Sequence, residues 1–268
     1  MHSETQARSL ADLVDALQAV GRYVLRQDEA LATLGVSSEA LRKAAQRLAK
    51  KGRLAIPRQG FYVIVPLEYR SAGAPPPDWY IEDLMLFLGV PYYVGLLSAA
   101  ALHGAAHQQP QEFQVVAASQ LRPAAAGRAR IRFFKKKHME RTPTVAVKTE
   151  TGFIKVSTPE ATALDLVRYA KSAGQIGNVA TVLSELSERL AGDRLLEAAR
   201  ADGDVSTVQR LGYLLDHLGS GSLTDDLAAW VQEQRPRSLP LRADIPAAEV
   251  PLDPRWRLHI NDRIEVDE

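Results

Sequence analysis

A chain of 268 residues with 46% hydrophobic residues is long enough for two folded domains and has the apolar content of a globular protein. It contains no cysteine, which excludes disulfides, thiolate nucleophiles and cysteine-based zinc sites and fits a reducing compartment. No apolar run is long enough to cross a bilayer, and the first residues lack the basic start and apolar core of a signal peptide. We therefore expect a cytoplasmic protein without membrane contacts.

The formal net charge of +1 hides a strong asymmetry along the chain. Residues 1–66 carry ten Lys and Arg against six Asp and Glu, and residues 118–141 carry eight against one. Residues 143–268 carry fourteen basic residues against twenty acidic ones. The first two segments can attract a polyanion, whereas the third repels one.

The stretch from Asp28 to Val65 carries the clearest structural signal. Leu31 and Leu34 mark a short helix that ends at Gly35, a residue that readily adopts the left-handed backbone of a tight turn. Ser37 is placed to cap a second helix by accepting a hydrogen bond from a free backbone N–H. That second helix has an apolar stripe at steps of three and four, formed by Leu41, Ala45 and Leu48. Helix, glycine turn and second helix are the pattern of a helix-turn-helix.

Two short strands, Leu54–Ile56 and Phe61–Val65, follow this pattern and are joined at Pro57–Gly60 as a hairpin. A hairpin directly after a recognition helix is a wing. We expect bases to be read from the helix by Ser38, Arg42, Lys43 and Gln46. We expect phosphates or a groove edge to be contacted by Arg47, Lys50, Lys51, Arg53, Arg58 and Gln59. The alternative is a small helical domain that packs against another protein and has a solvated basic face.

The pattern divides the chain into three parts. Residues 1–66, with a first helix at about Ala11–Val20, form the expected winged helix-turn-helix domain. Residues 67–80 contain Pro75–Pro77 and have the composition of a stiff, exposed linker. Residues 81–268 form a larger C-terminal domain of mixed α and β structure, so the predicted fold class is α+β.

The elements expected in this larger domain follow from periodicity and turn signals. Extended segments are predicted at Pro91–Val94, Phe113–Val116, Ala129–Phe134, Thr144–Lys148, Phe153–Val156 and Trp256–Asn261. Helices are predicted at Asp83–Leu88, Ser98–His103, Thr158–Tyr169, Asn178–Leu190, Asp193–Arg200, Val205–Leu218 and Leu223–Gln234. The hairpin at residues 144–156 is the only predicted strand pairing within this domain.

A second basic run lies within the C-terminal domain and consists of Arg128, Arg130, Arg132, Lys135, Lys136 and Lys137. On a strand, Arg130 and Arg132 point to one face, while Ile131 and Phe133 point to the other. Two interpretations are equally supported. The run is either a solvated edge strand whose charges prevent sheet-to-sheet pairing, or a further surface for operator DNA or RNA.

No pattern of catalytic residues stands out. His103 and His107 have a spacing that can bind a metal on a helix, but Gly104 follows at once and a third ligand is missing, so we expect ordinary helix-end histidines. Glu160 lies near a helix N-terminus, where a carboxylate favours the helix dipole, and we expect a structural role. The sequence has no phosphate-binding loop and no nucleophile elbow. We therefore expect no enzyme activity, no metal and no cofactor.

Taken together, the motifs resemble those of AbiEi-type antitoxins, the repressor components of type IV toxin–antitoxin systems. The resemblance begins with the winged pattern ending in Gly60-Phe-Tyr. Four further segments carry it along the chain, namely Ser98-Ala-Ala-Ala-Leu-His-Gly104, Ser157-Thr-Pro-Glu-Ala-Thr-Ala-Leu-Asp-Leu166, Arg210-Leu-Gly-Tyr-Leu-Leu215 and Arg255-Trp-Arg-Leu-His-Ile-Asn261. The order of these segments is more specific than any one of them.

This resemblance implies a cognate AbiEii-like nucleotidyltransferase toxin and a role in phage defence by abortive infection. It also implies that the N-terminal domain represses the shared operon at inverted repeats of double-stranded operator DNA, while the C-terminal domain neutralises the toxin without a stable complex. We expect the halves to be separable, so that a fragment from Asp78 onward protects against the toxin but does not repress. The alternatives are a stand-alone winged-helix repressor with a ligand-binding or dimerisation domain, and a protein-interaction module without a DNA role.

Overall fold

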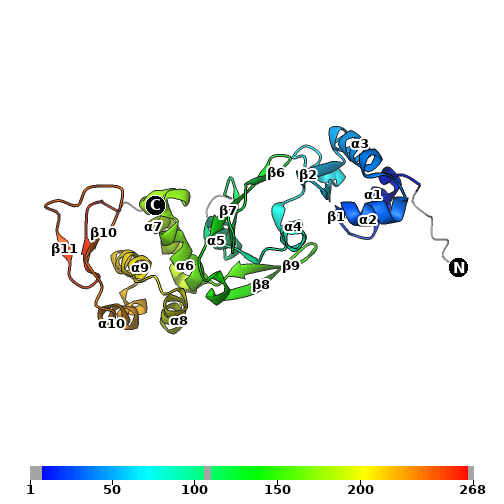
Figure 1. The fold of residues 1–268 in the computed structure, drawn as a ribbon. Helices are drawn as coiled ribbons and strands as arrows, with labels where there is room; N and C mark the ends of the chain where they lie inside the picture. Colours follow the sequence, from blue (N-terminus) through cyan, green and yellow to red (C-terminus); the bar gives the residue numbers. More distant parts are fainter. Residues whose placement is uncertain (1–7, 106–109, 265–268) are drawn as a thin grey trace.

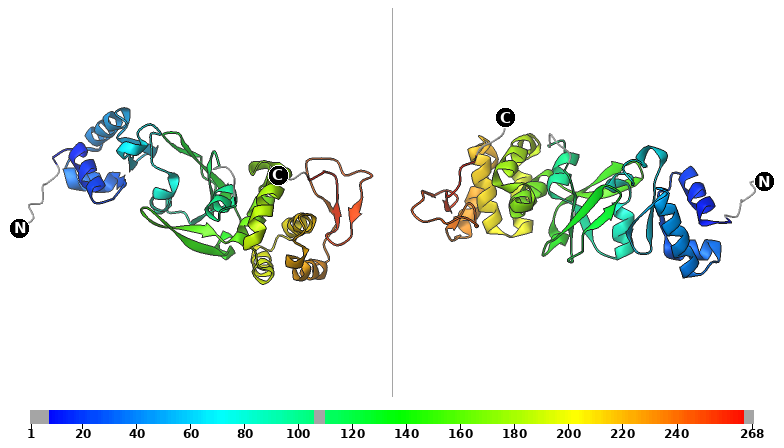
Figure 2. Two further views of the ribbon diagram at one scale, coloured as in Figure 1. Left: turned by 180° about the vertical axis from the view of Figure 1, so that it is seen from behind. Right: turned by 90° about the horizontal axis from the view of Figure 1, so that it is seen from above.

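The computed structural model describes residues 8–105 and 110–264. Within these ranges the chain is a mixed α and β protein with ten α-helices and three sheets. The molecule is elongated: α1–α3 lie at one end, the largest sheet lies in the middle, and β10 and β11 lie at the other end (Figures 1 and 2). No helix in the described part of the chain combines the length and apolar character needed to span a membrane.

The N-terminal elements are α1 (Leu10–Ala19), β1 (Val24–Arg26), α2 (Gln27–Leu34), α3 (Ser38–Lys50), β2 (Leu54–Arg58) and β3 (Phe61–Ile64). The local signals act as expected. Gly35 ends α2 with a φ of 62°, and the Ser37 hydroxyl caps α3 by accepting a hydrogen bond from the Ala40 N–H at 3.2 Å. The buried residues of α3 are Leu41, Ala45 and Leu48. Strand β1 was not predicted; it pairs antiparallel with β3 and gives a three-stranded sheet in the order β1-β3-β2.

Strand β3 is buried on both faces. Tyr62 and Ile64 pack against α1–α3 in a small N-terminal core. Phe61 and Val63, which point the other way, belong to a second core that continues into the rest of the chain. The uninterrupted apolar run in this strand is the sequence signal for burial on two sides, since a strand with one solvated face alternates.

Residues 67–80 are exposed only in part, so the prediction of an exposed linker was wrong for the second half of the segment. The segment contains two 3-10 helices, η1 (Leu67–Tyr69) and η2 (Pro77–Trp79), and both Ala74 and Tyr80 are buried. Gly73 lies so close to Gly127 that a Cβ atom on Gly73 would come within 2.8 Å of the Gly127 Cα. Ala74 and Tyr80, on either side of Pro75–Pro77, belong to the core that also contains residues of the central sheet.

The central sheet has six strands in the order β6-β7-β5-β4-β9-β8. Its strands are β4 (Tyr92–Val94), β5 (Phe113–Ala117), β6 (Ala124–Ala126), β7 (Ala129–Lys135), β8 (Thr144–Thr149) and β9 (Gly152–Ser157). The pairs β5–β7 and β4–β9 are parallel, and the other pairs are antiparallel. One face, with Val94, Val115 and Ile131, packs on α4 (Ile81–Leu88) and on the N-terminal sheet. The opposite face, with Tyr93 and Val116, packs on the C-terminal helices.

The C-terminal layer is mostly helical and covers that second face (Figure 1). Its α-helices are α5 (Leu96–Leu102), α6 (Pro159–Arg168), α7 (Gln175–Leu186), α8 (Gly192–Asp202), α9 (Val205–His217) and α10 (Asp225–Glu233). Shorter 3-10 helices are η3 (Met139–Arg141), η4 (Ala170–Ser172), η5 (Ser187–Arg189) and η6 (Gly221–Leu223). After α10, a small three-stranded sheet is formed by β10 (Leu239–Pro240), β11 (Leu252–Asp253) and β12 (Leu258–His259). The predicted last strand shrinks to two residues because Trp256 lies in a turn, where its indole N–H donates to Asp216 Oδ2 at 2.7 Å.

A buried ion cluster joins the sheet to the helices. Lys136 follows β7, and its Nζ atom lies 2.8 Å from both Asp165 Oδ1 on α6 and Asp202 Oδ2 on α8. The Tyr93 hydroxyl donates to the other Asp165 oxygen at 2.8 Å. Arg168 pairs with Asp202 from the other side. Burial raises the pKa of the Asp165 carboxyl, and Lys136 opposes that shift.

Replacing Lys136 is expected to destabilise the protein strongly. Lys136→Met leaves the buried Asp165 carboxylate without a cation and Asp202 with Arg168 alone, and breaking a buried pair costs about 3–5 kcal/mol. The adjacent Lys137 is exposed, so Lys137→Met is expected to change stability by less than about 0.5 kcal/mol. Urea unfolding of both variants measures the difference. Equal stability of the two variants would contradict the structural role of the cluster.

The same variant has a predicted pH dependence. Without Lys136, the Asp165 carboxyl has a pKa in the folded state that lies further above its unfolded value, so the folded state binds more protons than the unfolded state. The stability of Lys136→Met should therefore fall as pH rises above the unfolded pKa of an aspartate, about 4. Urea unfolding across that range tests the sign, with Lys137→Met as the reference.

The shared core predicts that the N-terminal sheet and the central sheet unfold together. Removing residues 1–77 would expose the apolar face formed by Ile81, Leu84 and Met85, so a fragment that starts at Asp78 is expected to aggregate or to lack fixed tertiary packing. In the full chain, far-UV circular dichroism and tryptophan fluorescence should report coincident urea transitions. Two resolved transitions, together with a well-folded fragment, would show that the halves are independent.

Candidate nucleic-acid interface

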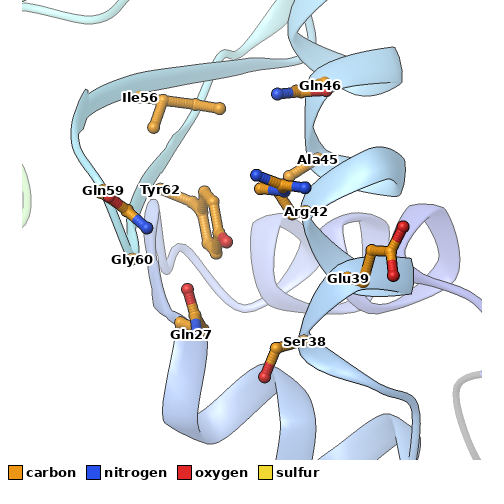
Figure 3. Close-up of a pocket in the computed structure, with 10 residues that line it drawn as sticks. All are labelled: Gln27, Ser38, Glu39, Arg42, Ala45, Gln46, Ile56, Gln59, Gly60 and Tyr62. Atoms are coloured by element: carbon orange, nitrogen blue, oxygen red, sulfur yellow. The ribbon is translucent and has the colours of Figure 1, made fainter.

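A groove of about 620 Å³ lies between α3 and the β2–β3 hairpin (Figure 3). Ser38, Arg42 and Gln46 line it from the helix, and Gln59 and Tyr62 line it from the hairpin side. Three of the four residues predicted to read bases therefore share one cavity with a residue of the predicted wing. The prediction did not include the six other lining residues, Gln27, Glu39, Ala45, Ile56, Gly60 and Tyr62.

The helix α3 presents its polar residues in two rows. Ser38, Arg42 and Gln46 are spaced by four residues, about 6 Å along the axis, and line the groove. Lys43 and Arg47 form a second row that is also exposed. Neither Arg42 nor Arg47 has a carboxylate partner among the described residues, whereas Lys43 pairs with Glu39 at 2.8 Å. The groove therefore has polar side chains on its helix side, among them a guanidinium without a carboxylate partner in the described residues, and Glu39 adds one carboxylate.

The predicted phosphate contacts differ in their surroundings. Lys50 and Lys51, at the end of α3, are exposed and have no ion pair within the described ranges. Arg53 is bound to Asp15 of α1, and its side chain is only 23% exposed. The charge of Arg53 is therefore paired, because α1 brings Asp15 back from 38 residues away.

Arg58 is not free at the tip of the hairpin. Its guanidinium donates to the carbonyl oxygens of Arg122 and Pro123, the latter at 3.1 Å, and lies over the Phe133 ring at 5.9 Å. Burial lowers the pKa of this guanidinium. Of the turn residues, Gln59 alone is exposed, while Pro57 and Gly60 are buried. The hairpin tip is thus packed against the central sheet, and Arg58 can reach a phosphate only by giving up these contacts.

The second basic run follows the predicted alternation in part. Arg130 and Arg132 are exposed on β7, and Ile131 and Phe133 are buried. Lys136 was assigned to this surface and is instead inside the protein, held by two aspartates. Over Ala129–Ile131, strand β7 is also not at the edge of the sheet, because β6 pairs with its outer side there. The exposed members of the basic run are Arg128, Arg130, Arg132, Lys135 and Lys137.

The residues weighed for catalysis have structural surroundings. The His103 Nε2 atom lies 2.7 Å from the Ser157 carbonyl oxygen, and His107 lies outside the described residues. Glu160 is buried and accepts hydrogen bonds from Arg194 Nε at 2.9 Å and from the Ala191 N–H at 3.3 Å. Within the described ranges no group of three or more metal-ligating residues gathers.

Comparison with solved structures finds an extensive likeness of fold. The RV2827C protein from Mycobacterium tuberculosis aligns with a TM-score of 0.66 and 16% identity, covering 92% of this chain and 89% of that chain. At this identity the likeness concerns the fold alone. An antigenic nucleotidyltransferase-like protein from Paracoccidioides brasiliensis aligns with a TM-score of 0.33 and 11% identity over 53% of this chain and 90% of that chain, which is too low to define a shared fold.

Sequence comparison identifies the family. No curated protein gives a significant match. Residues 93–217 match the model of the AbiEi antitoxin C-terminal domain. The matched region begins in β4, contains α5–α9, and includes three of the segments on which the resemblance was based. Residues 93–217 therefore carry an AbiEi antitoxin C-terminal domain, and this match supports an antitoxin of the AbiEi type.

Proposed function

We propose that residues 8–65 form a winged helix-turn-helix domain that binds operator DNA in the promoter of its own operon and represses it. The groove beside α3 carries this proposal, because it presents Ser38, Arg42 and Gln46 in one row, and the Arg42 guanidinium has no carboxylate partner within residues 8–105 and 110–264. Arginine and glutamine are the side chains that pair with guanine and adenine edges in a major groove. The cations around the groove supply attraction to phosphates.

In this proposal the C-terminal domain counters a nucleotidyltransferase toxin. The family match supports an antitoxin role, and the identity of the toxin follows only from the resemblance to AbiEi-type systems. The protein acts by binding and not by catalysis. Co-expression of the full chain with the neighbouring gene tests this part: the pair should restore growth that the neighbouring gene alone suppresses. Unrestored growth would contradict the antitoxin role.

The exposed basic residues of β7 are proposed to extend the nucleic-acid surface. A single DNA-binding module buries about 600–1,000 Å² of protein surface, which is little for an operon repressor. The alternative explanation, an edge strand whose charges prevent sheet-to-sheet pairing, does not apply to Arg130, because β6 pairs with that side of β7 at Ala129–Ile131. Arg132 has only a long contact with Glu112, at 3.5 Å, so its charge is not tightly paired.

Arg42 is expected to contribute to sequence recognition. Arg42→Ala should cost about 1–3 kcal/mol in binding to the promoter duplex and much less on a random duplex of equal length. Arg47→Ala, in the outer row of α3, is the matched control and should weaken both complexes equally. Fluorescence anisotropy with both duplexes provides the measurement. Equal losses for Arg42→Ala on the two duplexes would reduce Arg42 to a phosphate contact.

Reversing the charge of β7 is expected to weaken the complex with operator DNA. The double variant Arg130→Glu and Arg132→Glu should lower affinity and reduce the slope of log affinity against log salt, since fewer counterions are released. Both side chains are exposed, so urea stability should stay near that of the wild type. If the reversed protein binds the promoter duplex with wild-type affinity and slope, this strand is outside the interface.

A further inference from the structure

The hairpin that should act as the wing is held at its tip by the central sheet. Gly60 lies against Phe87 of α4, where an added Cβ would come within 3.5 Å of the ring. Arg58 is bound on the other side by carbonyl groups of the segment between β5 and β6. The tip is therefore enclosed by two elements of the central region, and it offers a ligand little more than Gln59.

The segment that holds Arg58 brings a cation of its own. Residues 118–123 connect β5 to β6, and Arg122 within this segment is exposed. The side chain of Arg122 has no ion pair or hydrogen bond with any described residue. Its backbone carbonyl accepts a hydrogen bond from Arg58, so the Arg122 side chain begins directly beside the hairpin tip. The sequence places these two arginines 64 residues apart.

The contact between the two arginines holds the backbone of Arg122 in place and leaves the Arg122 guanidinium without a partner among the described residues. The Arg58 guanidinium donates to two successive carbonyl oxygens, those of Arg122 and Pro123. It also donates to the carbonyl oxygen of the preceding residue, Pro57, at 3.0 Å. A guanidinium can bridge several acceptors in one plane, whereas an ammonium cannot reproduce this geometry. The stack on Phe133 restricts the guanidinium further.

We propose that Arg122, and not Arg58, makes the phosphate contact beside the wing, and that Arg58 is the positioning residue that holds the Arg122 backbone in place. The ligand is the sugar–phosphate backbone of double-stranded DNA, contacted as the recognition helix enters the major groove. The inference rests on the proposed DNA-binding function and adds a contact from the central sheet region to it. It also explains why burying a wing-tip arginine is compatible with DNA binding.

The salt dependence of binding to a random duplex tests this assignment. Arg122→Ala should reduce the slope of log affinity against log salt by about 1. Arg58→Lys keeps the positive charge but cannot bridge the two carbonyl groups, so it should reduce the slope by a similar amount. The double variant should show no further reduction. Arg200→Ala, an exposed arginine on α8 in the C-terminal helical layer, serves as the matched control and should keep the wild-type slope.

The outcomes separate the possible roles. A wild-type slope for Arg122→Ala overturns the proposal. A wild-type slope for Arg58→Lys, with unchanged urea stability, means that only the charge matters at that position. A wild-type slope with reduced urea stability means that Arg58 has a purely structural role. Either result overturns the positioning role. If Arg42→Ala impairs promoter binding while Arg122→Ala does not, only the present inference fails. If the wild-type chain binds neither the promoter duplex nor the random duplex, the proposed function fails as well.

Discussion

The burial of strand β3 on both faces is the constraint on which the arrangement of this molecule depends. Tyr62 and Ile64 need the N-terminal helices, and Phe61 and Val63 need α4 and the central sheet. Because each large apolar side chain contributes about 1.5–3 kcal/mol when it is removed from water, neither set can be left exposed without a considerable loss. The helix α3 is therefore held in a fixed orientation to the six-stranded sheet by packing, and not by the short connection at residues 67–80.

The second junction in the molecule is ionic. Lys136 links the end of β7 to α6 and α8, so the strand that carries Arg130 and Arg132 is fixed to the helical layer at its far end. A buried ion pair contributes little net stability compared with well-packed apolar residues, but it restricts how the elements that carry its charges can pack. Here it requires three elements to meet at one point. The N-terminal groove and the helices of the AbiEi domain are thus attached, through separate contacts, to opposite faces of one sheet.

Features that depend on local chemistry could be predicted from the sequence. The cap at Ser37, the end of α2 at Gly35 and the apolar stripe of α3 rest on residues a few positions apart, and the pleat alone separates Arg130 and Arg132 from Ile131 and Phe133. What was missed depends on distant partners. Strand β1 exists through pairing with β3, and Lys136 is buried because Asp165 and Asp202, 29 and 66 residues away, face it. One signal was present, since an aspartate within the apolar run of α6 needs a buried cation.

If the proposed DNA-binding function holds, the fixed hairpin determines how this domain contacts DNA. A mobile wing changes conformation to enter a DNA groove and loses conformational entropy on binding. A hairpin that is already ordered by Arg58 and Phe87 loses little conformational entropy. The same packing takes its charged tip away from the ligand. A preorganised groove with a short wing must therefore obtain its remaining phosphate contacts from neighbouring elements that are equally rigid. The segment before β6 and the outward face of β7 meet that requirement, because both belong to the sheet against which the hairpin is packed.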